Sequence, residues 1–86
     1  MNMEKWINNH PDVKEFGATR FAYTRTDCTE YIMAERNWNG ICRTMVYHYD
    51  CGNLVSINTQ PASIPSVLSA FFGNIFAIEE LHIIEK

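Results

Sequence analysis

Long apolar runs are absent from this sequence. The most apolar stretch, residues 64–78, contains a proline, a glycine and several polar residues, and it is shorter than the roughly 20 residues that a membrane-spanning helix needs. The first nine residues include Glu4 and no apolar core, so they are unlike a secretory signal. These absences predict a cytoplasmic protein that does not enter a membrane.

Motifs for catalysis, phosphate binding or metal binding are also absent. The four glycines lie at positions 17, 40, 52 and 73, too far apart for a glycine-rich phosphate loop. The three cysteines lack Cys-x-x-Cys spacing, and their odd number fits a reducing compartment where thiols stay free. The net charge of −3 gives no positive field for nucleic-acid phosphates. We therefore expect no catalytic residue, no metal and no cofactor.

What the chain does contain is the pattern of a small mixed domain. Its 86 residues are enough for one domain, residues 1–86, and the hydrophobic fraction of 47% is ordinary for a globular protein. From residue 19 to residue 59, β-branched and aromatic residues dominate, and turn sequences recur at Asp27-Cys28, Asn39-Gly40 and residues 50–53. Asn-Gly is a strong hairpin signal because both residues tolerate positive φ. The pattern predicts a four-stranded antiparallel meander.

Helical patterns flank the predicted meander. Residues 3–16 are helical in pattern with a break, and Pro11 suits a first helical turn while Gly17 suits a helix stop. After the meander, Ser63 is a natural N-cap, and apolar residues recur at helical spacing at Ile64, Val67, Leu68, Phe71, Phe72 and Ile75. Residues 78–84 predict a short last strand. The expected fold is α+β: a four-stranded antiparallel meander with a helix packed on one face and a short C-terminal strand, in the order α-β-β-β-β-α-β.

Two-residue loops would also define the register of the strands. A loop at Asp27-Cys28 places Arg25 opposite Glu30 and Arg20 opposite Glu35, which are two favourable charge pairs. A loop at Asn39-Gly40 places two arginines, at positions 36 and 43, opposite each other. Because like charges repel there, we expect the strand ends to splay or a bulge to shift them.

This register divides the strand residues between two faces of the sheet. The first face would carry Phe21, Tyr23, Ile32, Ala34, Ile41, Met45, Tyr47 and Leu54. The second face would carry Ala22, Thr24, Tyr31, Met33, Thr44, Val46, His48, Val55 and Ile57. The first face is the more apolar, so we expect the helix after the meander to cover it and to bury Leu68, Phe71, Phe72 and Ile75. The N-terminal segment, or else a partner, would then cover the second face.

Cysteine and histidine residues are the first candidates for chemistry. A metal site from Cys28, Cys51, Asp27 and Asp50 is conceivable, because both loops lie at the same end of a meander. We expect two strand spacings, roughly 10 Å, to separate them, so neither a metal nor a disulfide is predicted. His48 lies three residues before Cys51, but a strand position and a turn position do not make a nucleophile–base pair.

The function predicted by elimination is protein binding. We expect a small non-catalytic protein that binds and inhibits a partner protein through Trp38 and the second face, with partner-binding residues Trp38, Tyr31, Met33 and His48. Immunity proteins and anti-defence proteins of phages or mobile elements are analogous in size and composition only. Two alternatives stay open: a single-stranded nucleic-acid binder using a Tyr/Arg sheet face, and a small homo-oligomeric enzyme or ligand-binding protein with a site between subunits. Nucleic acid is the less favoured partner, and a homodimer is left open.

Overall fold

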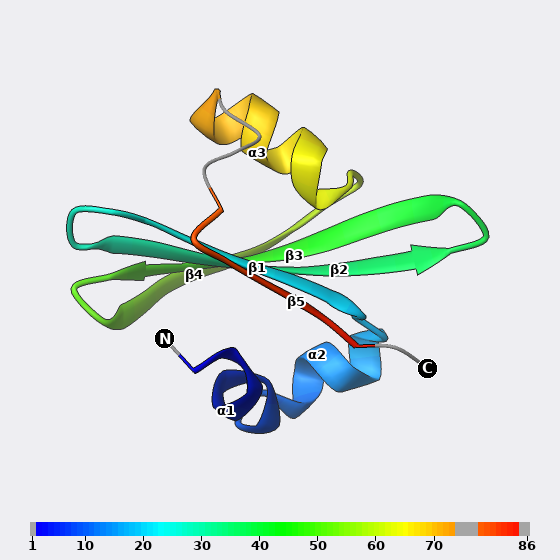
Figure 1. Cartoon of the computed structure of the whole chain (residues 1–86), viewed down its shortest axis with the longest axis horizontal. Helices are drawn as coiled ribbons and strands as arrows, with labels where there is room; N and C mark the ends of the chain where they lie inside the picture. Colours follow the sequence, from blue (N-terminus) through cyan, green and yellow to red (C-terminus); the bar gives the residue numbers. More distant parts are fainter. Residues whose placement is uncertain (1, 74–77, 85–86) are drawn as a thin grey trace.

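The computed structural model describes residues 2–73 and 78–84 as a three-layer α+β arrangement. The elements are α1 (Met3–Asn8), α2 (Pro11–Phe16), β1 (Arg20–Thr26), β2 (Thr29–Trp38), β3 (Ile41–Asp50), β4 (Asn53–Gln60), α3 (Ile64–Phe72) and β5 (Glu80–Ile83). Figure 1 shows the sheet between α3 on one side and α1 with α2 on the other. The predicted class and element order, with the N-terminal helical segment broken in two, are confirmed.

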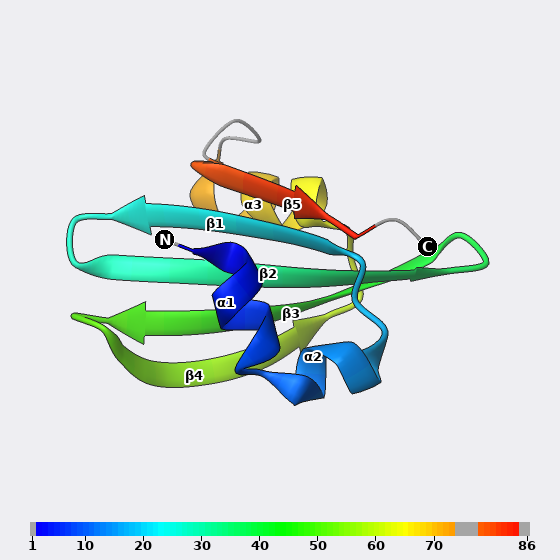
Figure 2. The same cartoon turned by 60° about the horizontal axis from the view of Figure 1, so that its bottom comes forward.

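All strands belong to one antiparallel sheet in the order β4-β3-β2-β1-β5. The meander forms the first four positions, and β5 returns to pair with β1 (Figure 2). As a result β4 and β5 are the two edge strands.

The hairpin turns have the left-handed backbone that their sequences predict. Asp27, Asn39 and Cys51 have φ values of 53°, 53° and 49°, and glycine follows the last two with φ values of 79° and 81°. The loops are two residues long, so Arg25 lies opposite Glu30 as predicted, and Arg20 lies opposite Glu35. The register prediction for the first hairpin is confirmed.

The expected distortion at Arg36 and Arg43 was wrong. The two residues are directly opposed in an unbroken register. Arg36 avoids its neighbour by turning to α2, where its guanidinium carbon lies 4.5 Å from the centre of the Phe16 ring and the side chain donates to the Phe16 carbonyl oxygen. Tertiary contact therefore offsets the repulsion that the paired strands alone would suffer.

The irregularity occurs instead between β3 and β4. His48 pairs with Ser56 and Tyr49 pairs with Leu54, so Val55 is an extra residue on β4. This bulge places Ile57 opposite Tyr47, on the first face, whereas the sequence predicted the second face for Ile57. Side chains at positions 56, 58 and 60 point to the second face instead.

The assignment of helices to faces was also wrong. The N-terminal helices α1 and α2 cover the first face, where Trp6, Ile7 and Val13 pack with Phe21 and Tyr47. Helix α3 covers the second face, where its buried residues pack on Ala22 and Met33. The number of apolar residues on each face of the sheet therefore does not determine which helix covers it.

Polar groups on the second face hold the start of α3 there. Glu35 is buried, and its carboxylate accepts a hydrogen bond of 2.8 Å from the backbone N–H of Ile64. The Thr44 hydroxyl donates to the Ala62 carbonyl oxygen over 2.7 Å. A carboxylate at a helix N-terminus satisfies a free N–H and interacts favourably with the helix dipole. Both partners lie just before or at the first turn of α3, so they place that helix on the second face.

The covered stripe of α3 is narrower than predicted. Ile64, Val67 and Leu68 are buried, and Phe72 is half-buried. Phe71 is 62% exposed, so its predicted burial was wrong. The fourth predicted residue, Ile75, lies outside the described residues. The side of α3 that carries Leu68 and Phe72 packs on the sheet. Phe71 lies on the side of the helix that is open to solvent, where it lines a hollow together with residues of β4.

Candidate functional site

The structure separates the four residues predicted to bind a partner. Tyr31 and His48 are cross-strand neighbours on the second face, and both are half-buried. Met33 is fully buried beneath α3, so it supports this face from below. Trp38 is 71% exposed on the opposite face, seven residues and therefore roughly 23 Å along β2 from Tyr31. Only Tyr31 and His48 can contribute to one site.

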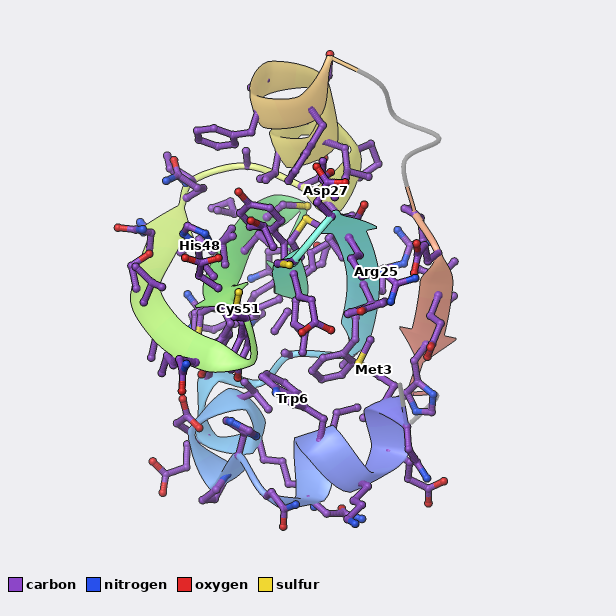
Figure 3. All side chains as sticks on the ribbon, turned by 90° about the vertical axis from the view of Figure 1, so that its left-hand side faces the viewer. Met3, Trp6, Arg25, Asp27, His48 and Cys51 are labelled. Carbon is purple, nitrogen blue, oxygen red and sulfur yellow. The ribbon has the colours of Figure 1, made fainter. Side chains whose placement is uncertain are left out.

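These two residues belong to a groove between α3 and the outer strands of the sheet. We call it the α3–β4 groove; its volume is about 230 Å³, and it is lined by Tyr31, Val46, His48, Ser56, Asn58, Gln60, Val67, Phe71 and Phe72. Figure 3 looks along the strands at this end of the sheet, with α3 above and Trp6 below. The groove is the part of the second face that α3 leaves uncovered.

Aromatic rings form the floor of the α3–β4 groove. The Tyr31 and His48 rings are stacked, with centroids 4.8 Å apart and an interplanar angle of 16°. Phe72 meets Tyr31 edge-on, also at 4.8 Å. Such packing holds three rings in place before any ligand arrives, so little rotamer entropy is lost on binding.

The polar wall of the groove was missed by sequence reasoning. Ser56, Asn58 and Gln60 follow one another at every second position of β4, which is the spacing of one strand face. The alternation was visible in the sequence. The bulge at Val55 reversed the face to which it was assigned.

The outer edge of β4 adjoins this wall. Strand β4 has eight residues and pairs only with β3 among the described residues, so one side of its backbone is open. Its sequence, Asn53 to Gln60, contains no charged residue and no proline. Three of its apolar side chains, Leu54, Val55 and Ile57, are exposed.

The other edge strand also exposes apolar side chains, Leu81 and Ile83, but it differs in length and charge. Strand β5 has four residues, and it includes Glu80 and His82. Short, charged edges discourage pairing with another chain, and long uncharged edges permit it. The two edges of this sheet are therefore unequal in length and charge. The hollow that β5 borders through Leu81 measures about 140 Å³, which is smaller than the α3–β4 groove.

Polar clusters on the first face serve to attach the helices. The Trp6 indole N–H donates to the Tyr49 hydroxyl over 2.9 Å, and the His10 ring stacks on Trp6 with centroids 4.0 Å apart. The Tyr47 hydroxyl donates to the Asp12 carboxylate, and burial together with this bond raises the pKa of Tyr47 above its ordinary value. These contacts tie α1 and α2 to β3, which accounts for the cluster structurally.

A second buried tyrosine, Tyr23, also donates its hydroxyl to a carboxylate and has a raised pKa. The Tyr23 hydroxyl donates to Glu30 over 2.5 Å, and burial followed by this bond raises the pKa of Tyr23 to about 12. Tyr23 and Tyr47 both lie under α1 and α2. The rings of these two tyrosines are therefore covered by the helices and are not open for stacking with a base.

The cysteines at the hairpin tips are closer than the sequence predicted. The Cys51 backbone N–H donates to the Cys28 carbonyl oxygen over 2.9 Å, so the two residues are one strand spacing apart and not two. The prediction overlooked that Cys28 comes directly before β2 and Cys51 directly after β3, which are adjacent strands. Among residues 2–73 and 78–84, no three His, Cys, Asp or Glu side chains are grouped to hold a metal ion.

Comparisons with protein-family models, curated proteins and solved structures gave no match. Within the described part of the chain, no helix has the length and apolar character needed to cross a membrane. The argument for function therefore depends on the geometry of the α3–β4 groove and the β4 edge.

Proposed function

We propose that this protein is a non-catalytic binding protein that captures an extended segment of a partner protein along β4 and thereby inhibits the partner. One observation carries the proposal: an eight-residue, uncharged edge strand with exposed apolar side chains borders an aromatic groove. Strand addition to an open edge supplies backbone hydrogen bonds, and an adjoining pocket supplies side-chain specificity. The β4 edge and the α3–β4 groove offer both.

The size of the groove favours a side chain over a free small molecule. Sites for small ligands usually measure roughly 300–1,000 Å³. The α3–β4 groove, at about 230 Å³, is below that range. It suits one large apolar or aromatic side chain, with Ser56, Asn58 and Gln60 available to hydrogen-bond polar atoms beside it.

The chemistry of β4 favours a different protein over a second copy of this chain. Two β4 strands paired edge to edge would present Ser56, Asn58 and Gln60 of the second copy on the groove side. These side chains are polar and would leave the aromatic floor without an apolar occupant. A foreign strand with an apolar residue at that position fills the groove, so we assign the edge to another protein.

Inhibition follows from this mode of binding. A segment added to β4 has one side of its backbone and one row of side chains occupied, because alternate side chains of a strand point to the same face. The partner cannot use that segment elsewhere while it is bound. Catalysis is not needed for this effect.

The test compares two isoleucine substitutions on the same face of the sheet. Ile57→Lys puts a charge on the β4 edge, and Ile41→Lys puts one at the Trp38 hairpin; the two side chains are 46% and 67% exposed. A protein retained from native lysate should be lost with Ile57→Lys and kept with Ile41→Lys. With the purified partner, Ile57→Lys should weaken binding by at least about tenfold, a cost of about 1.4 kcal/mol.

Three other outcomes would reject the proposal. Loss with Ile41→Lys alone would move the binding surface to the Trp38 hairpin. A homodimer in analytical ultracentrifugation that Ile57→Lys dissociates would assign β4 to a second copy. Turnover of a small substrate that His48→Ala abolishes would show that the groove is catalytic.

A further inference from the structure

Cys28 and Cys51 lie side by side at one end of the sheet. Cys28 is in the β1–β2 turn and Cys51 in the β3–β4 turn, the two tips drawn at the left of Figure 1. Their backbones share the 2.9 Å hydrogen bond, one step beyond the last β2–β3 pair, Thr29 with Asp50. Directly opposed residues of an antiparallel ladder have Cα atoms about 4.5–5.5 Å apart.

That separation suits a covalent bridge. A disulfide spans Cα distances of about 4.4–6.8 Å. We propose that Cys28 and Cys51 form a dithiol site that closes to an intramolecular disulfide by exchange with a small-molecule disulfide. The site is separate from the α3–β4 groove and does not depend on the function proposed for it.

The side chains meet the requirements for exchange. Both cysteines are exposed free thiols, so a small disulfide can reach either sulfur (Figure 3 labels Cys51). Hydrogen bonding with the Cys28 side chain raises the pKa of the Cys51 thiol, and the charges of Cys28 and Asp50 act in the same direction. Cys51 therefore keeps its proton longer than an isolated cysteine, and we take Cys28 as the sulfur that begins the exchange.

The reaction has two exchange steps. The Cys28 thiolate attacks one sulfur of the small disulfide, which forms a mixed disulfide and releases one small thiolate. Cys51 then loses its proton to solvent and attacks the Cys28 sulfur, which forms the Cys28–Cys51 bond and releases the second small thiolate. Two protein thiols are oxidised, and one small disulfide is reduced to two thiols.

The third cysteine provides an internal control. Cys42 is half-buried near the start of β3, nine residues before Cys51, so it lies roughly 30 Å away along the strand. Neither Cys28 nor Cys51 can bridge to Cys42 in the folded chain. Exchange in the native protein should therefore produce a single linkage.

The experiment treats the reduced full-length chain with oxidised glutathione and maps the product. Trypsin cleaves after arginine and lysine, so each cysteine falls in its own peptide: residues 26–36, 37–43 and 44–86. We expect the chain to lose two hydrogen atoms in mass and to yield the 26–36/44–86 linked pair. That pair should exceed the other two linkages by at least about tenfold in the native chain, because the sheet holds the two sulfurs together.

Matched variants and a denatured sample complete the test. Cys42→Ser should form the same linkage, whereas Cys28→Ser and Cys51→Ser should each stop at a glutathione adduct. In denaturant the preference for the 26–36/44–86 pair should disappear. A native chain that carries glutathione on both Cys28 and Cys51, links to Cys42 equally, or does not react while the denatured chain does would overturn the proposal.

Discussion

Two truncations on α3 distinguish its buried face from its open one. Leu68 is fully buried on the second face, so Leu68→Ala should cost about 2–5 kcal/mol of unfolding free energy. A fully buried phenylalanine would cost about 3–5 kcal/mol on truncation, but Phe71 is 62% exposed, and little more than a third of that cost applies. Phe71→Ala should therefore cost about 1–2 kcal/mol.

Urea unfolding followed by circular dichroism measures both values on the same scale. An 86-residue domain has a total stability on the order of 4–13 kcal/mol, so both variants should show a shifted urea midpoint, and Leu68→Ala should show the larger shift. The slope of the unfolding free energy against urea should be unchanged in both variants. Equal costs for the two truncations would mean that Phe71 is packed on the sheet, that the α3–β4 groove is closed, and that the proposed binding site does not exist.

Two further predictions concern the polar contacts. Glu35→Ala should lower the unfolding free energy measured in urea by about 1–3 kcal/mol, because it leaves the Ile64 N–H without its acceptor. Glu35→Gln keeps an acceptor oxygen and should cost less. Equal costs for the two variants would contradict the role of that hydrogen bond. Stability should also fall as pH rises from about 10 towards 12. The pKa of Tyr23 is raised to about 12 and that of Tyr47 is raised too, so the folded state keeps protons that the unfolded state releases above its ordinary tyrosine pKa of about 10. Tyr47→Phe should reduce this alkaline loss, and an unchanged pH profile in that variant would show that the hydroxyl of Tyr47 does not contribute to it.

The local features of the fold were predictable because they depend on neighbours in sequence. The Asn39-Gly40 turn and the Asp27-Cys28 turn determine pairings over several residues on each side, and the predicted opposition of Arg25 and Glu30 is observed. Helix boundaries followed from Pro11, Gly17 and Ser63 for the same reason.

The candidate site was only half predictable. Tyr31 and His48 were placed together because the register of β2 and β3 follows from one two-residue turn. Ser56 and Asn58 were missed because one extra residue in β4 exchanges the faces of all residues beyond it. Trp38 was predicted as part of the same surface because it flanks the Asn39-Gly40 turn, but its place on β2 puts its side chain on the opposite face.

By itself the sequence determined the α+β class, the element order and the register of the first two hairpins, all of which arise from turn chemistry and periodicity. Only the tertiary structure decided which helix covers which face, since the buried Glu35 and Thr44 bind the start of α3 to the second face although that face is the less apolar. It also decided that an extra residue at Val55 turns Ser56, Asn58 and Gln60 of β4 to the second face. The reason is that contacts between distant segments depend on how whole elements are packed, and a polar anchor or a single bulge can outweigh the apolar pattern of a strand.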